Sequence, residues 1–178
     1  LKARGVSLPI VHLDNSAGLL EFDRYDDMVR AGIVIYGLYP SETVRAELGD
    51  RFPLEPAMEL ISHISHIKTL APNHGVSYGA TYVTDHTVRV ATVPVGYADG
   101  YPRALSGKGE VLVRGRRCPV LGRICMDQMM VDISAVPEAE IEDRVVLVGC
   151  DGGEQISVYE VADMAYSFPY EWVCGISR

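Results

Sequence analysis

Two apolar runs with a short polar segment between them open the chain. Residues 6–13 and residues 28–36 are mostly apolar. Between them, Asp14-Asn15-Ser16 offers side chains that cap the start of a helix. The pattern predicts a strand, a short helix and a second strand, which is the order found at the end of an α/β barrel. A complete barrel of this TIM type takes about 250 residues, so these residues are its last units at most.

The pattern changes from residue 38 onward. Residues 38–56 are charged and interrupted by proline and glycine, which predicts a linker. After it, short apolar runs alternate with turn residues, and this is typical of a small β-barrel or sandwich. The strands are expected at residues 58–70, 88–95, 111–113, 118–124, 129–133, 144–148 and 170–176.

One helix is expected within this β-rich part. Ser157 and Glu160 have the spacing of a capping box, and apolar residues follow at helical intervals. The predicted fold class is a mainly β C-terminal domain, a small barrel or sandwich of about eight strands with one or two helices. The last βα units of an incomplete TIM-type α/β barrel precede it. We place the boundary between residues 1–45 and residues 46–178.

The composition excludes several classes of function. The formal net charge is −8, and an acidic chain repels phosphate backbones, so no nucleic acid is expected as a partner. No apolar run approaches the length that spans a membrane, and no secretory pattern is present. The four cysteines lack a CxxC spacing, which leaves a metal site unsupported and fits reduced thiols in the cytoplasm. Because the chain begins with Leu1 rather than Met, we expect a fragment or a domain of a longer protein.

Tyr78 is a candidate for chemistry because of its neighbours. It lies between Ser77 and Gly79, in a turn from which its ring can project. A phenol ionises near a pH of about 10, so it acts as a base at neutral pH only where donors or cations lower its pKa. From the residues alone, a half-buried tyrosine of the core remains the more common alternative.

Three short segments follow one another along the chain, each beside strand-like sequence. They are Ser77-Tyr78-Gly79-Ala80-Thr81-Tyr82, Gly96-Tyr97-Ala98-Asp99-Gly100-Tyr101-Pro102-Arg103 and Gly122-Arg123-Ile124-Cys125-Met126-Asp127-Gln128. Together they resemble the C-terminal half of alanine racemase, a family of enzymes that use pyridoxal 5′-phosphate (PLP). In that family, a tyrosine at the position of Tyr78 is the base that moves a proton at the α-carbon of the substrate. The resemblance therefore implies a catalytic role for Tyr78.

The same resemblance implies a set of PLP contacts. Arg30 matches an arginine that faces the pyridine nitrogen, and a guanidinium leaves that nitrogen without a proton, which suits racemisation rather than transamination. Ser16, Gly32 and Ile33 match phosphate contacts, and Tyr170 matches the phosphate-binding tyrosine. From the residues alone, Arg30 reads equally well as a strand-end arginine that reaches solvent, and Tyr170 as an ordinary strand aromatic.

Two more residues match the substrate site of the family. Tyr97 resembles a gate on the access channel. Met126 resembles the residue whose backbone N–H binds the substrate carboxylate, a fixed donor that does not depend on the side chain. Without the family, Met126 would be core filler, as most methionines are. Asp99 and Asp127 are expected to shape turns, and no histidine is assigned a catalytic role.

One part of the family's two-base mechanism is missing from the chain. The second base is the lysine that forms a Schiff base with PLP, and Lys2, Lys68 and Lys108 all lie outside the sequence context of that lysine. The resemblance implies that the full-length protein interconverts L-alanine and D-alanine, supplies D-alanine for peptidoglycan, and works as a homodimer whose active site is shared between subunits. The chain alone is expected to be inactive and to hold no PLP.

Two alternatives stay open. One is a catalytically silent β-domain used for assembly or binding, which the missing lysine and the start at Leu1 favour. The other is a racemase for a larger amino acid such as lysine or serine. Tyr97 argues against the second, because a bulky aromatic gate narrows the channel.

Overall fold

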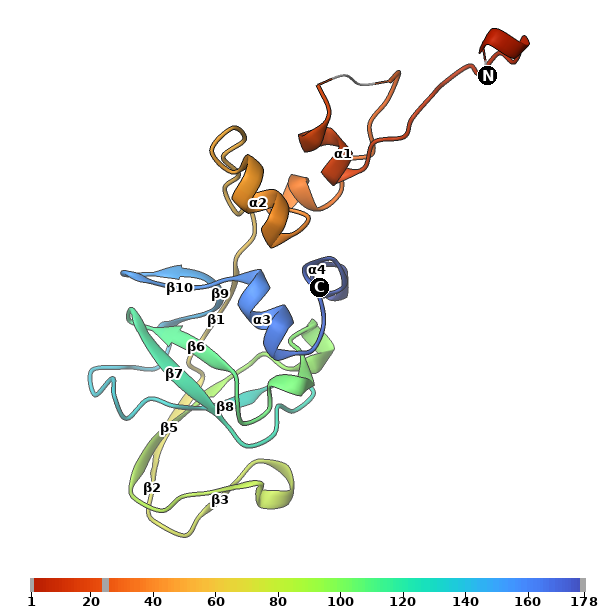
Figure 1. The fold of residues 1–178 in the computed structure, drawn as a ribbon. Coiled ribbons are helices and arrows are strands. Elements are labelled where there is room, and N and C mark those ends of the chain that lie inside the picture. The colour runs from red at the N-terminus through yellow and green to blue at the C-terminus, as the bar shows by residue number, and fades with distance from the viewer. Residues whose placement is uncertain (1, 24–25, 177–178) are drawn as a thin grey trace. The chain divides into compact units, whose positions relative to one another are not determined.

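The structure, a computed structural model, describes residues 2–23 and 26–176 (Figure 1). The chain divides into two compact units, Leu1–Met58 and Glu59–Arg178, and each is described by itself. This division follows Met58, whereas the boundary expected from the sequence follows residue 45.

The N-terminal unit is built of short helices. Asn15 caps the first α-helix, because its side-chain oxygen accepts hydrogen bonds from the N–H groups of Ala17 and Gly18, both at 3.1 Å. The helix predicted after Asp14-Asn15-Ser16 is therefore confirmed. The elements of this unit are the 3₁₀ helix η1 (Lys2–Arg4), α1 (Ser16–Glu21), the 3₁₀ helix η2 (Ile33–Tyr36) and α2 (Glu42–Leu48).

The two strands predicted in this unit are not formed. Residues 6–13 are irregular and almost entirely exposed, and residues 28–32 are irregular up to the start of η2. A strand is held by hydrogen bonds to a neighbouring strand. Here the two segments are joined by a backbone bond from the N–H of Met28 to the carbonyl of Val11 at 3.3 Å. A single bond does not make the ladder that a strand requires, and the strand prediction is wrong for these residues.

The stretch expected to be a linker is folded. Residues 38–56 contain α2, whose Val44 is buried while its charged residues lie on the exposed side. Tyr39 and Val44 pack with Leu20 in the core of the unit. The linker prediction is wrong because the charged residues of this stretch cover the outer face of a packed helix.

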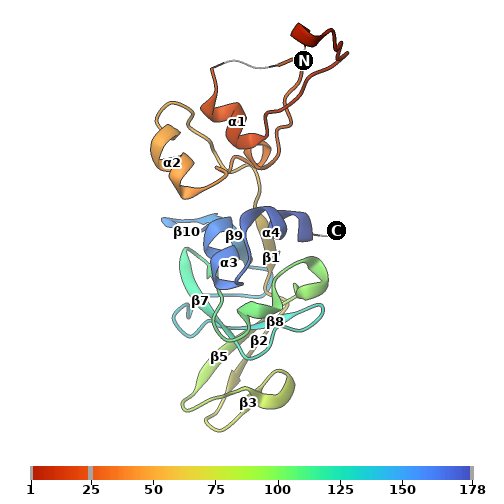
Figure 2. The same cartoon turned by 45° about the vertical axis from the view of Figure 1, so that its right-hand side comes forward.

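The C-terminal unit is a curled sheet. One eight-stranded sheet has the order β1-β9-β6-β7-β8-β5-β2 with β10 paired to β9, and β3 pairs separately with β4. Because β1 and β2 follow each other in the chain, the two ends of the sheet belong to one run and the sheet curls round (Figures 1 and 2). The strands are β1 (Leu60–His63), β2 (His66–Leu70), β3 (Gly75–Val76), β4 (Tyr82–Val83), β5 (Val88–Val93), β6 (Glu110–Val113), β7 (Arg116–Leu121), β8 (Met129–Asp132), β9 (Arg144–Asp151) and β10 (Glu154–Ile156).

Most strand predictions in this unit are confirmed. The predicted hairpin of β6 and β7 is present and antiparallel. The long run expected at residues 58–70 is broken at Ile64 and Ser65. There the N–H of Ile64 donates to the carbonyl of Asp143, and the N–H of Ser65 donates to the carbonyl of Thr92, both at 2.9 Å. This break lets one run pair with β9 through β1 and with β5 through β2.

Two helices, α3 (Val158–Met164) and α4 (Pro169–Gly175), lie at one end of the sheet, away from β3 (Figures 1 and 2). Ser157 caps α3 by accepting a hydrogen bond from the N–H of Glu160 at 3.1 Å, so the predicted helix and its N-cap are confirmed, while the Glu160 carboxylate bonds to Arg117. The strand predicted at residues 170–176 is wrong, because these residues belong largely to α4. Pro169 stands in the first turn of α4, where its fixed φ favours a helix and its missing N–H costs nothing.

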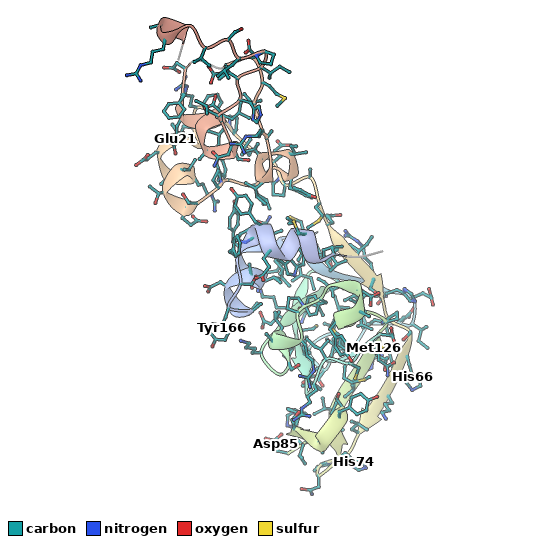
Figure 3. All side chains as sticks on the ribbon, turned by 90° about the vertical axis from the view of Figure 1, so that its right-hand side faces the viewer. Glu21, His66, His74, Asp85, Met126 and Tyr166 are labelled. Atoms are coloured by element: carbon teal, nitrogen blue, oxygen red, sulfur yellow. The ribbon has the colours of Figure 1, made fainter. Side chains whose placement is uncertain are left out.

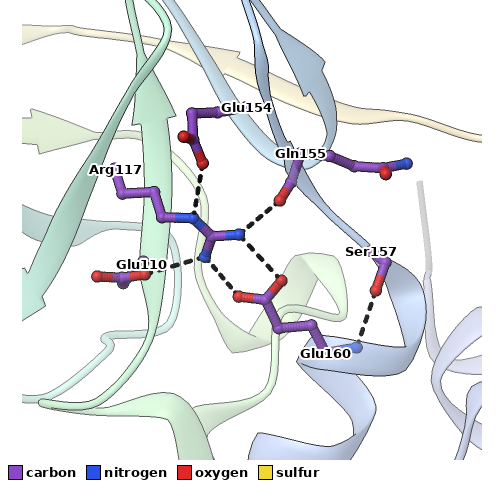
Figure 4. Close-up of polar contacts among 6 residues, drawn as sticks. All are labelled: Glu110, Arg117, Glu154, Gln155, Ser157 and Glu160. Carbon is purple, nitrogen blue, oxygen red and sulfur yellow. Dashed lines mark hydrogen bonds and ion pairs between the residues drawn. The ribbon is translucent and has the colours of Figure 1, made fainter.

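Arg117 on β7 ties α3 to the sheet (Figure 4). Its guanidinium donates to Glu160 of α3 at 2.6 Å and to Glu110 of β6 at 3.0 Å. It also donates to the carboxylate of Glu154 at 3.1 Å and to the carbonyl of Gln155 at 2.5 Å, both on β10. The side chain of Arg117 is 32% exposed, so the charges are only partly screened by water. One guanidinium thus holds two strands and a helix against β7.

We expect Arg117→Met to destabilise the C-terminal unit by about 1–2 kcal/mol, between the values typical of exposed and of buried ion pairs. The loss arises because three carboxylates would face one another without a cation. Urea unfolding of the chain measures it. Arg116→Met is the matched control, since the recorded bond of Arg116 is to one carbonyl, that of Ala135. Equal losses in the two variants would contradict the role of Arg117.

Arg114 and Asp143 form an ion pair. This pair predicts that the stability of the fold depends on pH. Two hydrogen bonds from Arg114 hold the pKa of Asp143 below its ordinary value. A carboxyl group with a lowered pKa stabilises the fold when ionised, so its contribution is complete at neutral pH and is lost as the pH falls below about 4. The stability difference between wild type and Asp143→Asn should therefore shrink on going from neutral to acidic pH. Urea unfolding at several pH values measures it, and a constant difference would contradict it.

Candidate active site

Tyr78 stands on a tight turn between β3 and β4. It begins the 3₁₀ helix η3 (Tyr78–Ala80), and its side chain is 71% exposed. Ser77 and Gly79 on either side have φ values of 60° and 72°. The ring therefore projects from the surface, as the turn sequence predicted, and the alternative of a core tyrosine does not hold.

The second segment packs its backbone against the third. Tyr97 lies in the 3₁₀ helix η4 (Tyr97–Asp99), and its N–H donates to the carbonyl of Cys125 at 3.1 Å. The N–H of Ala98 donates to the carbonyl of Met126 at 3.0 Å. Gly96 permits this contact, because a Cβ there would stand 2.2 Å from the Met126 carbonyl oxygen. Tyr97 and Met126 are thereby held on adjoining loops.

Asp99 shapes its turn, as expected from the sequence. Its carboxylate accepts a hydrogen bond from the N–H of Gly96 at 2.9 Å. A second 3₁₀ helix, η5 (Arg103–Leu105), follows, and Gly100 between the two contacts the end of α4. A Cβ on Gly100 would stand 2.4 Å from the carbonyl oxygen of Gly175.

The third segment carries Met126 on the loop between β7 and β8. The loop is closed by the N–H of Cys125, which donates to the carbonyl of Gln128 at 2.9 Å. The Met126 side chain is 53% exposed and points out from the unit (Figure 3). Among the described residues, none accepts a hydrogen bond from the Met126 N–H. This donor is therefore available to a ligand.

One side chain joins the first segment to the third. The Ser77 hydroxyl donates to the carbonyl of Arg123 at 2.5 Å and lies 3.4 Å from the Cys125 sulfur. The three segments thus meet around residues 123–126. We name the exposed residues gathered there the tyrosine face. It consists of Tyr78, Tyr97, Arg123 and Met126.

Arg123 is the member of the tyrosine face that sequence reasoning missed. Its guanidinium lies against the Tyr78 turn, since a Cβ on Gly79 would stand 3.6 Å from Nη1 of Arg123. The signal was present in the sequence, because Arg123 lies inside the third segment between Gly122 and Cys125. A strand-flanking arginine gives no hint by itself that it turns toward a loop 45 residues earlier in the chain.

Three of the expected phosphate contacts, Ser16, Gly32 and Ile33, lie together in the N-terminal unit. The Ser16 hydroxyl oxygen accepts hydrogen bonds from the N–H groups of Gly32 at 2.9 Å and Val34 at 3.5 Å. Its own hydrogen is then available to donate. Ile33 stands at the first position of η2, where a helix leaves its N–H without an internal partner. These donors fit an anion, whereas the first N–H groups of α1 are already bonded to Asn15.

Arg30 lies in irregular, exposed backbone rather than inside a strand. Its guanidinium donates to the carbonyl of Leu13 at 2.9 Å, and its N–H donates to the carbonyl of Asp14 at 2.7 Å. The interpretation as a strand residue is wrong, and the guanidinium keeps further donors for a ligand.

Tyr170 lies in the first turn of α4 and is half-buried. Its ring packs at 5.9 Å from that of Phe168. Burial raises the pKa of Tyr170, so its phenol stays protonated and can donate a hydrogen bond at neutral pH.

The remaining candidate groups show no reactive arrangement. Burial raises the pKa of Cys118 to about 11, so this thiol is unreactive near neutral pH. All four cysteines are within the described ranges, and none forms a disulfide. Nowhere in residues 2–23 and 26–176 do three His, Cys, Asp or Glu side chains gather as metal ligands. The described helices are too short or too polar to cross a membrane.

Comparison with known proteins shows the family of the chain. The family model described as alanine racemase, C-terminal domain, matches residues 57–178, and the model of the N-terminal domain matches residues 1–40. Fold and site define an enzyme class that joins an N-terminal barrel to a C-terminal β domain, which confirms the predicted fold class. The chain belongs to the alanine racemase family.

Individual relatives are similar along nearly all of this chain. Alanine racemase of Halothermothrix orenii is 46% identical over 97% of the chain and 45% of its own length, and alanine racemase 2 of Bacillus subtilis is 45% identical over 100% and 45%. The crystal structure of alanine racemase from Bacillus anthracis with bound L-Ala-P has a TM-score of 0.91 at 42% identity, covering 99% of this chain and 45% of that one. The chain therefore spans about 45% of the length of these relatives.

Proposed function

We propose that the full-length protein containing this chain interconverts L-alanine and D-alanine with PLP as cofactor. The observation that carries the proposal is the meeting of three separate segments, since Ser77, the neighbour of the exposed Tyr78, and Tyr97 both bond to the loop that carries Met126. The alanine racemase family is PLP-dependent, and its members named above are alanine racemases.

Three residues of the tyrosine face each take one task in this proposal. Tyr78 transfers a proton at the α-carbon, because its exposed phenol can reach a ligand beyond the surface of the unit. The Met126 N–H binds the substrate carboxylate as a fixed donor. Tyr97 narrows the access channel and so favours a small substrate, which argues against lysine or serine.

The residues of the N-terminal unit would hold the cofactor. Ser16, Gly32 and Ile33 would hold its phosphate and Arg30 its pyridine nitrogen, and the resemblance to the family assigns Tyr170 to the phosphate as well. When bound, PLP withdraws electrons from the α-carbon of an amino acid and makes its proton easier to remove. In the proposed assembly, residues 1–45 complete a TIM-type barrel, and Tyr78 serves the site of the other subunit of a homodimer.

The silent β-domain is the weaker alternative, since the similarity to racemases covers both the barrel segment and the β domain. One feature of this chain nevertheless makes it inactive alone in our proposal. It contains Lys2, Lys68 and Lys108 but no lysine in the family's catalytic context.

Its reduced cysteines and acidic charge fit the cytoplasm, where D-alanine is supplied for peptidoglycan.

A turnover assay on the full-length protein tests the proposal. We expect conversion of L-alanine to D-alanine with added PLP, at least about a hundredfold faster than turnover of lysine, since an oversized side chain clashes at the gate. The isolated chain should show neither turnover nor the absorbance band of bound PLP. Comparable turnover of lysine would contradict the role of Tyr97, and no turnover of either amino acid would contradict the proposed function.

A further inference from the structure

Ser77, the residue before Tyr78, has a backbone conformation that serine rarely adopts. Its φ is 60° and its ψ is −173°. This region is populated almost only by glycine, because a Cβ clashes with the backbone there. The chain places glycine at Gly75, Gly79 and Gly122 around the same turn, so a serine at this position is the more strained choice. A strained residue persists only where its surroundings hold it.

The contacts of the Ser77 hydroxyl stabilise this strained backbone. It donates to the carbonyl of Arg123 at 2.5 Å and contacts the sulfur of Cys125 at 3.4 Å. Gly122 allows the two loops to approach, because a Cβ there would stand 2.7 Å from the carbonyl oxygen of Val76 and 3.2 Å from the Ser77 Cβ. A glycine in place of Ser77 would relieve the strain but would lose both hydroxyl contacts.

The hydroxyl fixes the direction in which the next residue leaves the turn. Tyr78 is 71% exposed, so packing does little to hold its ring. Its direction is set by the backbone of the turn and by the tie to the loop that carries Met126. Ser77 therefore links the turn that carries the Tyr78 phenol to the loop that carries the Met126 N–H, the two groups of the proposed reaction site.

We propose that Ser77 is a positioning residue that holds Tyr78 in register with the Met126 loop, and that the protein accepts backbone strain for this purpose. The inference rests on the proposed function, since it assigns Ser77 a task in the reaction of Tyr78. Ser77 itself touches no reacting atom in this account and acts through its neighbour.

Three variants of the full-length protein separate the effect of the Ser77 hydroxyl bonds from the effect of the strained Ser77 backbone. Ser77→Ala removes the hydroxyl and keeps the Cβ, so it should melt at a lower temperature than wild type. Ser77→Gly removes both, so it should melt no lower than wild type. Both should lower kcat by about tenfold to a hundredfold, as expected for a misplaced catalytic group, while KM changes less than about threefold. Ser65→Ala is the matched control, because Ser65 also donates its hydroxyl to a backbone carbonyl, that of Thr92 at 3.0 Å.

Isotope effects provide a readout that a purely structural serine would not move. Tyr78 serves one face of the α-carbon, so poor placement of its phenol slows removal of the α-hydrogen of one enantiomer. The α-deuterium effect on kcat/KM should therefore rise in both Ser77 variants for the enantiomer whose α-hydrogen Tyr78 removes. It should fall for the other enantiomer, because slow proton delivery by Tyr78 makes removal of that α-hydrogen by the opposite base more reversible. Ser65→Ala should leave both values as in wild type.

The outcomes distinguish this inference from the proposed function. A Ser77→Gly protein that is as active as wild type, while Tyr78→Phe is inactive, overturns the positioning role alone. An active Tyr78→Phe protein overturns both. A stable, weakly active Ser77→Gly protein with an isotope effect raised for one enantiomer supports the inference, even where Ser77→Ala fails to fold.

Discussion

Replacing Tyr78 by phenylalanine in the full-length protein is expected to lower racemase kcat by about a hundredfold to ten-thousandfold, the range that a positioned acid–base group contributes. The substitution removes one oxygen atom from a ring that is 71% exposed, so the fold should be unaffected. The value of kcat/KM must fall equally in the two directions, because the equilibrium constant between enantiomers is one. The loss should appear in kcat rather than in KM, since the phenol is assigned to proton transfer and not to binding.

The control for this prediction is another exposed tyrosine. Tyr166 is 91% exposed, and its ring contacts Lys108 at 4.2 Å, outside the tyrosine face. Tyr166→Phe should therefore keep turnover within about twofold, as surface substitutions away from a site usually do. If Tyr78→Phe behaves like Tyr166→Phe, the tyrosine face is not where the proton is moved.

The second large effect is expected for Gly96→Ala, which should destabilise the C-terminal unit by about 3 kcal/mol, the upper part of the range for overpacking. The new Cβ would stand 2.2 Å from the carbonyl oxygen of Met126 and 2.3 Å from that of Cys125. Both atoms belong to backbone, so no flexible side chain can move aside. The loops that carry Tyr97 and Met126 would have to separate, and turnover of the full-length protein should fall with them.

Gly153→Ala is the matched control for Gly96→Ala. A Cβ on Gly153 meets no atom within 4 Å, and its φ is not in the left-handed region. Urea unfolding of the chain should show little change for this variant and a large loss for Gly96→Ala. Equal unfolding midpoints would show that the close contact between the two loops is not needed for stability.

Two elements follow from sequence because the residues that form them are close in the chain. The hairpin of β6 and β7 turns at Gly115, whose φ is 73°, and α3 begins after Ser157, whose side chain accepts a hydrogen bond from the N–H of Glu160 three residues later. Residues 6–13 failed as a strand because a strand depends on distant neighbours, which no local pattern specifies. Tyr170 was misassigned because its apolar run is as short as a strand, and Pro169 was not weighed as the start of a helix.

The candidate site was likewise predicted from the sequence only in part. Tyr78, Tyr97 and Met126 were predicted from three segments that resemble one family, and the structure brings those segments together. Ser77 was visible only as the neighbour of Tyr78, because its φ of 60° and its bond to Arg123 are properties of the folded backbone. No sequence pattern predicts a serine with a strained backbone, so the role of Ser77 could be inferred only from the structure.

The most direct test of the central claim is a crystal structure of the full-length protein with a bound alanine analogue. The claim is that the phenol of Tyr78 is the group delivered to the α-carbon of the substrate. The account predicts that Oη of Tyr78 lies about 3–3.5 Å from the position of the α-hydrogen, with the carboxylate of the analogue accepting a hydrogen bond from the Met126 N–H. A Tyr78 hydroxyl that points away from the analogue, with another side chain at that distance, would contradict the account.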